Sequence, residues 1–271
     1  MKRIGVIAAF IFLVSPGALW AQEKVVVGGS GGLFDEVKEI VKIYQAKNPS
    51  HQIEITAESI PTNASIEATK AGRLTIGLVG RPLRDEERGK LVYRPVARVP
   101  VGIGVHKSNP VGSLSESQVC GVFSGRVKSW REVGGGDGKI VVLAAIPKND
   151  VFSGALRKQM ACFTDLKVSP EAIVLNRVLE VLDALNHRPG TIGIISISAD
   201  MNSTRPNLKA ISVGGVFPSA EALQSGKYNY FHEYGIITIG EPQGVAKRFL
   251  EFMTNSESHK ILARGGITPV R

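Results

Sequence analysis

The hydrophobic positions change their spacing several times along the chain, and each change indicates a new element. Residues 25–27 are a β-branched run, glycine and serine fill 28–32, and apolar residues then recur at helical spacing from Leu33 to Tyr44. This order predicts a strand, a glycine loop and a helix. Asn48-Pro49 ends the helix, and the alternation over 52–56 predicts a second strand. The chain therefore opens with a βαβ unit.

The same alternation of elements continues to the carboxyl terminus. Two runs, 92–105 and 228–239, are extended and long enough to pass between two lobes. Strands that alternate with helices predict a parallel sheet in an α/β fold. The remaining expected helices are 65–71, 116–123, 153–162, 171–185, 244–254 and 256–263, and the remaining strands are 74–79, 140–145 and 192–197.

The amino terminus has the pattern of a cleaved secretory signal peptide. Lys2 and Arg3 precede an apolar run over 4–14, and small residues follow up to Ala21. The run is too short for a bilayer span, which needs about 20 residues. We expect a signal peptide over 1–21 and a location in the periplasm or outside the cell; an uncleaved anchor helix is the alternative.

Composition limits the classes of protein that remain. The 271 residues are 43% hydrophobic, too apolar for a disordered chain, and the length suits about two domains of ~150 residues. The formal charge of +9 favours acidic partners. The basic residues are scattered and only 6% of residues are aromatic, so we expect no nucleic-acid partner.

The glycine loop over 28–32 matches several motifs incompletely. Gly28-Gly29-Ser30-Gly31-Gly32 fits G-x-S-x-G, the nucleophile elbow of α/β-hydrolases, but it follows the first strand, whereas the elbow normally follows several. None of the five histidines stands in a setting that marks a triad. Phe34 stands where the dinucleotide-binding motif G-x-G-x-x-G needs its last glycine, and no other nucleotide or metal motif occurs. We expect no enzyme, cofactor or metal, with a serine hydrolase through Ser30 as an alternative.

The remaining candidate binding sites are helix amino termini. A glycine loop at a helix start exposes N–H groups and the positive end of the helix dipole, which suit an anion. The first such seat comprises Ser30, Gly31, Gly32 and Leu33. A second lies at Ser153, Gly154 and Ala155, with Lys148 nearby. Two seats on separate α/β units can converge on one anion, although a tight turn without a ligand is the simpler reading of either loop.

Five segments in order resemble the phosphate-binding proteins of bacterial ABC importers, which are extracellular solute-binding proteins with the type II two-lobed fold. Gly29-Ser30 to Tyr44 looks like the family's G-S-T-T loop and helix, and Ser153-Gly154-Ala155 falls at its S-G-T. Residues 122–134, with Phe123-Ser124-Gly125 and Trp130, are similar to its I-F-S-G-K-x-x-x-W segment. Residues 190–196 are similar to G-x-I-G-Y-x-S, and 246–271 to the family's final helices and G-x-x-P-V.

The resemblance implies a two-lobed α/β binding protein with its ligand in the cleft between the lobes. Lobe 1 would comprise 22–98 plus 235–271, and lobe 2 would comprise 99–234, with a hinge near Val99 and Tyr234. The ligand would be a small inorganic oxyanion, above all phosphate. The partner would be an ABC permease in the inner membrane, and the binding protein would act as a monomer.

The chain departs from the family pattern at several ligand positions. Gly31, Gly32 and Ala155 replace threonines, and Asn149 stands where an arginine is expected, with Lys148 one position away. No carboxylate follows the third strand at Thr75, Leu78, Val79 or Gly80, whereas Arg81 remains, and Thr62 or Asn63 would lie at the rim. The rival interpretation is a homologue that lost its ligand and acts in adhesion, signalling or envelope assembly.

The chain contains two cysteines, Cys120 and Cys162. Export to an oxidising compartment is compatible with a disulfide between them, and two buried thiols are the alternative. Some phosphate-binding relatives carry a cysteine pair at these positions, so the resemblance implies a Cys120–Cys162 disulfide.

Overall fold

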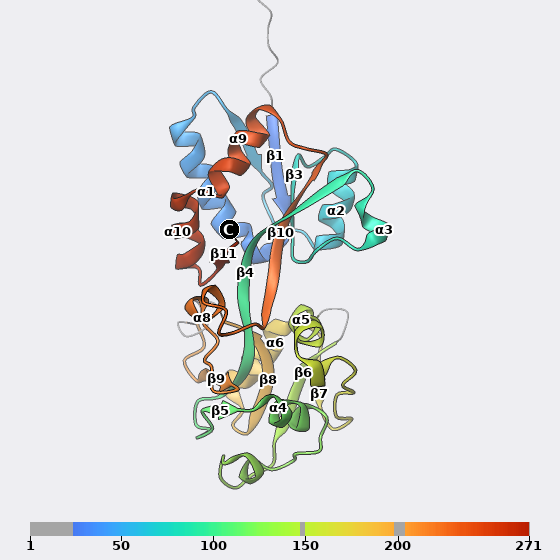
Figure 1. Ribbon diagram of the computed structural model, residues 1–271, viewed down its shortest axis with the longest axis vertical. Coiled ribbons are helices and arrows are strands. Elements are labelled where there is room, and N and C mark those ends of the chain that lie inside the picture. Colours follow the sequence, from blue (N-terminus) through green and yellow to red (C-terminus); the bar gives the residue numbers. More distant parts are fainter. Residues whose placement is uncertain (1–23, 147–149, 198–203, 271) are drawn as a thin grey trace, which may run out of the picture.

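Two long antiparallel strands, β4 (Leu91–His106) and β10 (Phe231–Ile239), run through the middle of the molecule and connect its two halves (Figure 1). The computed structural model describes residues 24–146, 150–197 and 204–270. The expected signal peptide and Lys148 lie outside these ranges. The expected extended run 92–105 agrees with β4, and the run 228–239 contains all of β10, which begins three residues later.

The first half is built on the sheet order β2-β1-β3-β10-β4. Strands β1 (Lys24–Gly29), β2 (Gln52–Ile55) and β3 (Ile76–Val79) are parallel, and β10 joins β3 in the antiparallel sense. The short strand β11 (Thr268–Pro269) pairs with β4. The helices of this half are α1 (Phe34–Lys47), α2 (Thr62–Lys70), α3 (Asp85–Arg88), α9 (Gly244–Met253) and α10 (Ser256–Arg264).

The second half uses the far end of β4 as its own central strand. There β4 pairs antiparallel with β8 (Thr191–Ser196) and β9 (Leu208–Val213), and β6 (Val141–Ala145) pairs parallel with β8 and with β7 (Ile173–Leu175). The remaining elements of this half are β5 (Ser113–Leu114), α4 (Glu116–Phe123), α5 (Val151–Gln159), α6 (Val178–His187) and α8 (Ala220–Gln224).

Each half has its own hydrophobic core, because apolar faces from its strands and helices meet there. The core of the first half draws on residues between 25 and 97 and between 236 and 267, whereas the main core of the second half lies within 101–228. This distribution suits the predicted lobes, 22–98 plus 235–271 and 99–234, whose exact limits stay a prediction. No helix within the described ranges is long and apolar enough to span a bilayer.

Three expectations about secondary structure were wrong in detail. The sheet is mixed rather than parallel, because β4 and β10 run against their neighbours. The helix expected over 171–185 is strand β7 followed by α6, since the β-branched pair Ile173-Val174 pairs with β6. The helix expected at 153 begins at Val151, because the Asp150 carboxylate caps it.

A disulfide joins Cys120 in α4 to Cys162, just beyond α5, which confirms the expected pairing. The two Cα atoms are 6.1 Å apart and the residues are 42 positions apart in sequence. Cys120 is buried in the core of the second half. The bond therefore fixes two helices of this half to each other.

We predict that the double substitution C120A/C162A lowers the free energy of unfolding by about 4 kcal/mol, because the unfolded chain regains the freedom of a loop of this length. Urea unfolding under oxidising conditions measures the loss. Unsubstituted protein unfolded with a reductant is the control, and it should show a similar loss. A difference below about 1 kcal/mol would contradict the stabilising role of the bond.

Candidate functional site

A cleft of about 650 Å³ opens between the two halves, beside the start of β10. Its walls come from the start of α2 and the loop after β3 in the first half, and from α5 in the second. The predicted site residues that line it are Thr62, Asn63, Arg81, Gly154 and Ala155. The cleft thus brings together residues that are far apart in sequence.

The loop that begins at Gly29 lies against the end of β3. The Ser30 N–H group donates to the Leu78 carbonyl at 2.9 Å, and Gly29 has a φ of 138°. A Cβ atom on Gly29 would lie 2.2 Å from the Leu78 oxygen, so only glycine fits there. The N–H groups of Gly31 and Gly32 then open a 3-10 turn over Gly31–Leu33, where no preceding turn supplies acceptors.

Gly32 and Leu33 belong to this loop and also take part in core packing. A Cβ atom on Gly32 would lie 2.2 Å from the Tyr234 ring, so the absence of a side chain is what admits that ring. The Leu33 side chain is 1% exposed in the core of the first half. None of the residues 30–33 is among those that line the cleft, and Gly32 and Leu33 offer it no polar side chain.

Three polar side chains from different elements face one point above Gly80. A Cβ atom built on Gly80 would lie 3.1 Å from Ser30 Oγ, 3.4 Å from Thr62 Oγ1 and 3.6 Å from His232 Nε2. The Gly80 N–H group donates to Thr62 Oγ1 at 2.9 Å, which leaves the Thr62 hydroxyl proton free to point elsewhere. A Cβ atom there would be crowded, so the absence of a side chain lets the three polar groups face one point on the cleft wall, which we call the recess above Gly80.

The second predicted seat is already filled by a carboxylate of the protein. Asp150 caps α5, accepting from the Ser153 N–H group at 2.9 Å and from the Ser153 hydroxyl. Burial raises the pKa of Asp150, and its bonds to Ser153 oppose that change. Gly154 and Ala155 remain on the cleft wall, and a Cβ atom on Gly154 would meet nothing within 4 Å.

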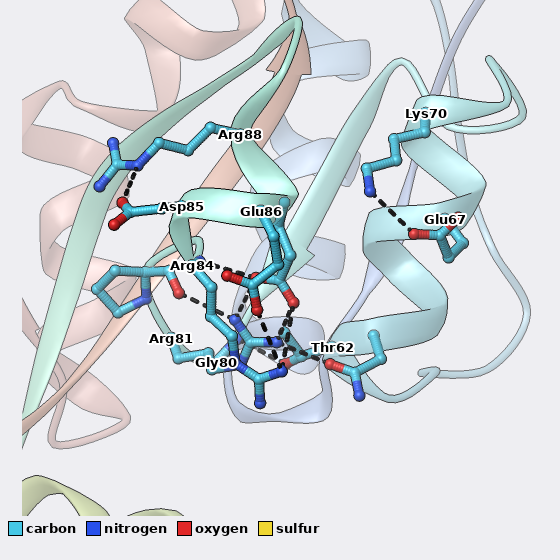
Figure 2. Close-up of polar contacts among 12 residues, drawn as sticks. Thr62, Glu67, Lys70, Gly80, Arg81, Arg84, Asp85, Glu86 and Arg88 are labelled. Atoms are coloured by element: carbon cyan, nitrogen blue, oxygen red, sulfur yellow. Dashed lines mark hydrogen bonds and ion pairs between the residues drawn. The ribbon is translucent and has the colours of Figure 1, made fainter.

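Arg81 points toward the acidic turn of α3, where Figure 2 shows it below Glu86. Its two terminal nitrogens donate to the Glu87 carboxylate at 2.6 and 2.7 Å, and one of them also donates to Asn63 Oδ1 at 2.8 Å. The hydrogen bonds from Arg81 hold the pKa of Glu87 at about 2. The charge of Arg81 is therefore balanced within the protein.

Sequence reasoning missed several residues of the cleft. His232 and Glu233 come from β10, Lys158 and Gln159 from α5, and Asp150 from the cap before it. The Asp150 cap has a sequence signal, since an acidic residue three positions before Ser153 suits a helix start. His232 has no such sequence signal, because an extended run does not indicate whether a histidine in it faces the core or the cleft.

The described residues offer no metal site and no catalytic triad. No group of three histidine, cysteine or acidic side chains converges within them. His232 lies beside Ser30, yet among the described residues no hydrogen bond joins the two side chains, and no carboxylate accompanies the imidazole. The nucleophile-elbow interpretation of Ser30 therefore lacks the geometry it needs.

A two-lobed α/β fold with a polar cleft at the crossing strands is the architecture of a solute-binding protein. A family model described as a PBP superfamily domain matches residues 16–257, and the chain belongs to this superfamily. Its fold is that of the type II periplasmic binding proteins.

Individual relatives are consistent with this membership. The phosphate-binding protein PstS of Bacillus subtilis (strain 168) is 27% identical, over 92% of this chain and 82% of its own. A structure of a putative phosphate ABC transporter substrate-binding protein with bound phosphate, from Clostridium perfringens, matches with a TM-score of 0.74 and 22% identity. The match covers 92% of this chain and 100% of that one. A phosphate transport receptor from Vibrio cholerae matches with a TM-score of 0.70 and 22% identity, with the same coverage.

We predict that Gly32→Ala lowers the free energy of unfolding by about 1–3 kcal/mol, because the new methyl group overlaps the Tyr234 ring. Gly31→Ala is the matched control in the same turn. Its methyl group would approach only Ser59 Oγ, at 3.2 Å. Chemical denaturation compares the two, and equal losses would contradict the packing role of Gly32.

We also predict that Glu87→Gln destabilises the protein at neutral pH and that this deficit shrinks as the pH falls. The folded pKa of Glu87 is about 2, below its ordinary value of 4.5, so its stabilisation is complete above about pH 5 and disappears toward pH 2. Glu86→Gln, at a side chain that is 70% exposed, is the control. Urea unfolding at several pH values provides the measurement, and a deficit independent of pH would contradict the prediction.

Proposed function

We propose that this protein is a periplasmic or secreted solute-binding protein that captures a small oxyanion, phosphate above all, for an ABC importer. The observation that carries the proposal is the cleft between the halves, with the Ser30 hydroxyl beside the recess above Gly80 on its wall. Membership of the PBP superfamily and relatives named as phosphate-binding proteins support the choice of ligand.

The proposed ligand is held mainly by uncharged donors. In this proposal the hydroxyls of Ser30 and Thr62 and the N–H groups of Gly31 and Gly32 bind it from lobe 1, and Gly154 and Ala155 border it from lobe 2. Arg81 acts through its bond to Asn63 rather than directly, because Glu87 occupies its donors and balances its charge. Such a site depends on closure, which removes competing water and strengthens each hydrogen bond.

The two crossing strands, β4 and β10, would act as the hinge on which the lobes close. We place lobe 1 at 22–98 plus 235–271, lobe 2 at 99–234, and the hinge near Val99 and Tyr234, where the β4–β10 register shifts between Tyr234 and Gly235. A ligand that contacts both lobes favours the closed form, because it binds that form more tightly. The closed monomer then presents both lobes to a permease in the inner membrane.

The carboxylate of Asp150 at Ser153 favours a second candidate, a homologue that keeps the fold without the ligand. An anion at that helix start would have to displace Asp150 or share its hydrogen bonds. This candidate would act as a secreted adhesion, signalling or envelope-assembly factor.

Calorimetric titration with phosphate, sulfate, molybdate and arsenate distinguishes the two candidates. A binding protein should release or absorb heat with at least one anion. At a concentration ~100 times the dissociation constant, that anion should add ~2.7 kcal/mol to the free energy of unfolding. Neither heat nor a shift in unfolding with any of the four would rule out the anion-binding function.

We predict that Ser30→Ala weakens phosphate binding by about ten-fold or more, since the anion loses one charge-assisted hydrogen bond. Ser113→Ala, on an exposed residue of β5 in the other half, is the control and should leave the affinity unchanged. Calorimetry measures both. Equal affinities of Ser30→Ala and the unsubstituted protein would exclude the Ser30 hydroxyl from the site.

A further inference from the structure

His232 is a buried polar side chain without a hydrogen-bond partner. It is 6% exposed, and none of the described residues offers a hydrogen bond to either ring nitrogen. Its ring is held edge-to-face by Tyr234, at 4.7 Å between centroids, and by Phe152 of α5, at 5.6 Å. His232 lines the cleft, so a ligand in the cleft can supply the missing hydrogen-bond partner.

The nitrogen that faces the cleft is Nε2. It lies 3.6 Å from the point where a Gly80 side chain would begin, and Ser30 Oγ and Thr62 Oγ1 lie within 3.4 Å of the same point. One of the two aromatic neighbours is on β10, as His232 itself is, and the other is on α5 of the second half. The ring orientation is therefore fixed by packing before any ligand arrives.

The three groups around this point differ in what they can offer a ligand. Thr62 Oγ1 already accepts from the Gly80 N–H group, so its hydroxyl proton is the part left to offer. Burial, with a smaller effect from Lys158, lowers the pKa of His232 to about 4, so the imidazole is neutral at neutral pH. A neutral imidazole has one nitrogen with a proton and one that accepts, and the accepting nitrogen is a stronger acceptor than a hydroxyl.

We propose that His232 contacts the bound oxyanion directly, with Nε2 accepting a hydrogen bond from a protonated anion oxygen seated above Gly80 between Ser30 and Thr62. This inference rests on the proposed function. It assigns the site to oxyanions that keep a proton at neutral pH, such as phosphate and arsenate. Sulfate has no proton to donate, and its oxygen would face the lone pair of Nε2.

The test is calorimetric titration with phosphate and with sulfate at neutral pH. The unsubstituted protein should bind phosphate more tightly than sulfate. His232→Leu should weaken phosphate binding about ten-fold or more without weakening sulfate binding, since only the protonated anion loses a hydrogen bond and sulfate loses a repulsive lone pair. His232→Gln, whose amide oxygen can accept, should recover much of the phosphate affinity. His106→Gln, at the far end of β4, is the control for loss of a histidine.

A second measurement needs no substitution and therefore does not depend on whether His232→Leu folds. The ¹⁵N signal of His232 Nε2 should have the shift of an unprotonated ring nitrogen, and phosphate should move it while sulfate should not. Thermal unfolding checks that each variant is folded before its affinity is compared.

The outcomes separate this inference from the proposed function. If the unsubstituted protein binds no anion, both fail. If it binds phosphate, and His232→Leu binds it equally well, only the role of His232 fails. A protonated Nε2, or equal loss of phosphate and sulfate in His232→Leu, would overturn the acceptor role.

Discussion

The antiparallel pairing of β4 with β10 is the interaction on which the rest of the structure depends. Both strands belong to the first sheet over residues 91–100 and 231–239, and β4 then continues as the central strand of the second sheet. Tyr93 and Arg98 on β4 both bond the Glu233 carboxylate on β10, at 3.0–3.1 Å, beside the cleft. This ladder sets how the two walls of the cleft face each other.

The cleft contains charged side chains, but the protein neutralises several of them itself. Glu87 pairs with Arg81, Arg98 pairs with Glu233, and Asp150 is bound by Ser153. Separating a partly buried pair leaves each charge without a partner, which is unfavourable. We therefore expect these side chains to stay paired. The surplus of positive charge in the sequence therefore attracts anions at long range, while hydroxyl and N–H groups remain as the donors at the recess above Gly80.

Local pattern predicted most of the elements. Helix 116–123 and the two final helices agree with α4, α9 and α10, because apolar spacing and end signals coincide there. The failures have non-local causes: Ile173-Val174 forms a strand because β6 lies beside it. The glycine loop was located correctly, but sequence reasoning could not see that Gly32 receives the Tyr234 ring or that Asp150 fills the turn at Ser153.

The sequence by itself determined the α/β class, the two extended crossings, the cysteine pair through its resemblance, and the loop at Ser30. These depend on spacing along the chain or on motifs a few residues long. Tertiary structure decided which side chains meet: it set His232 of β10 beside Ser30 and Thr62, and it turned Arg81 toward Glu87. Ser30 and His232 are about 200 positions apart in sequence, and the pairing of β10 with β3 brings them to the same recess. No local pattern could have predicted that they come together there.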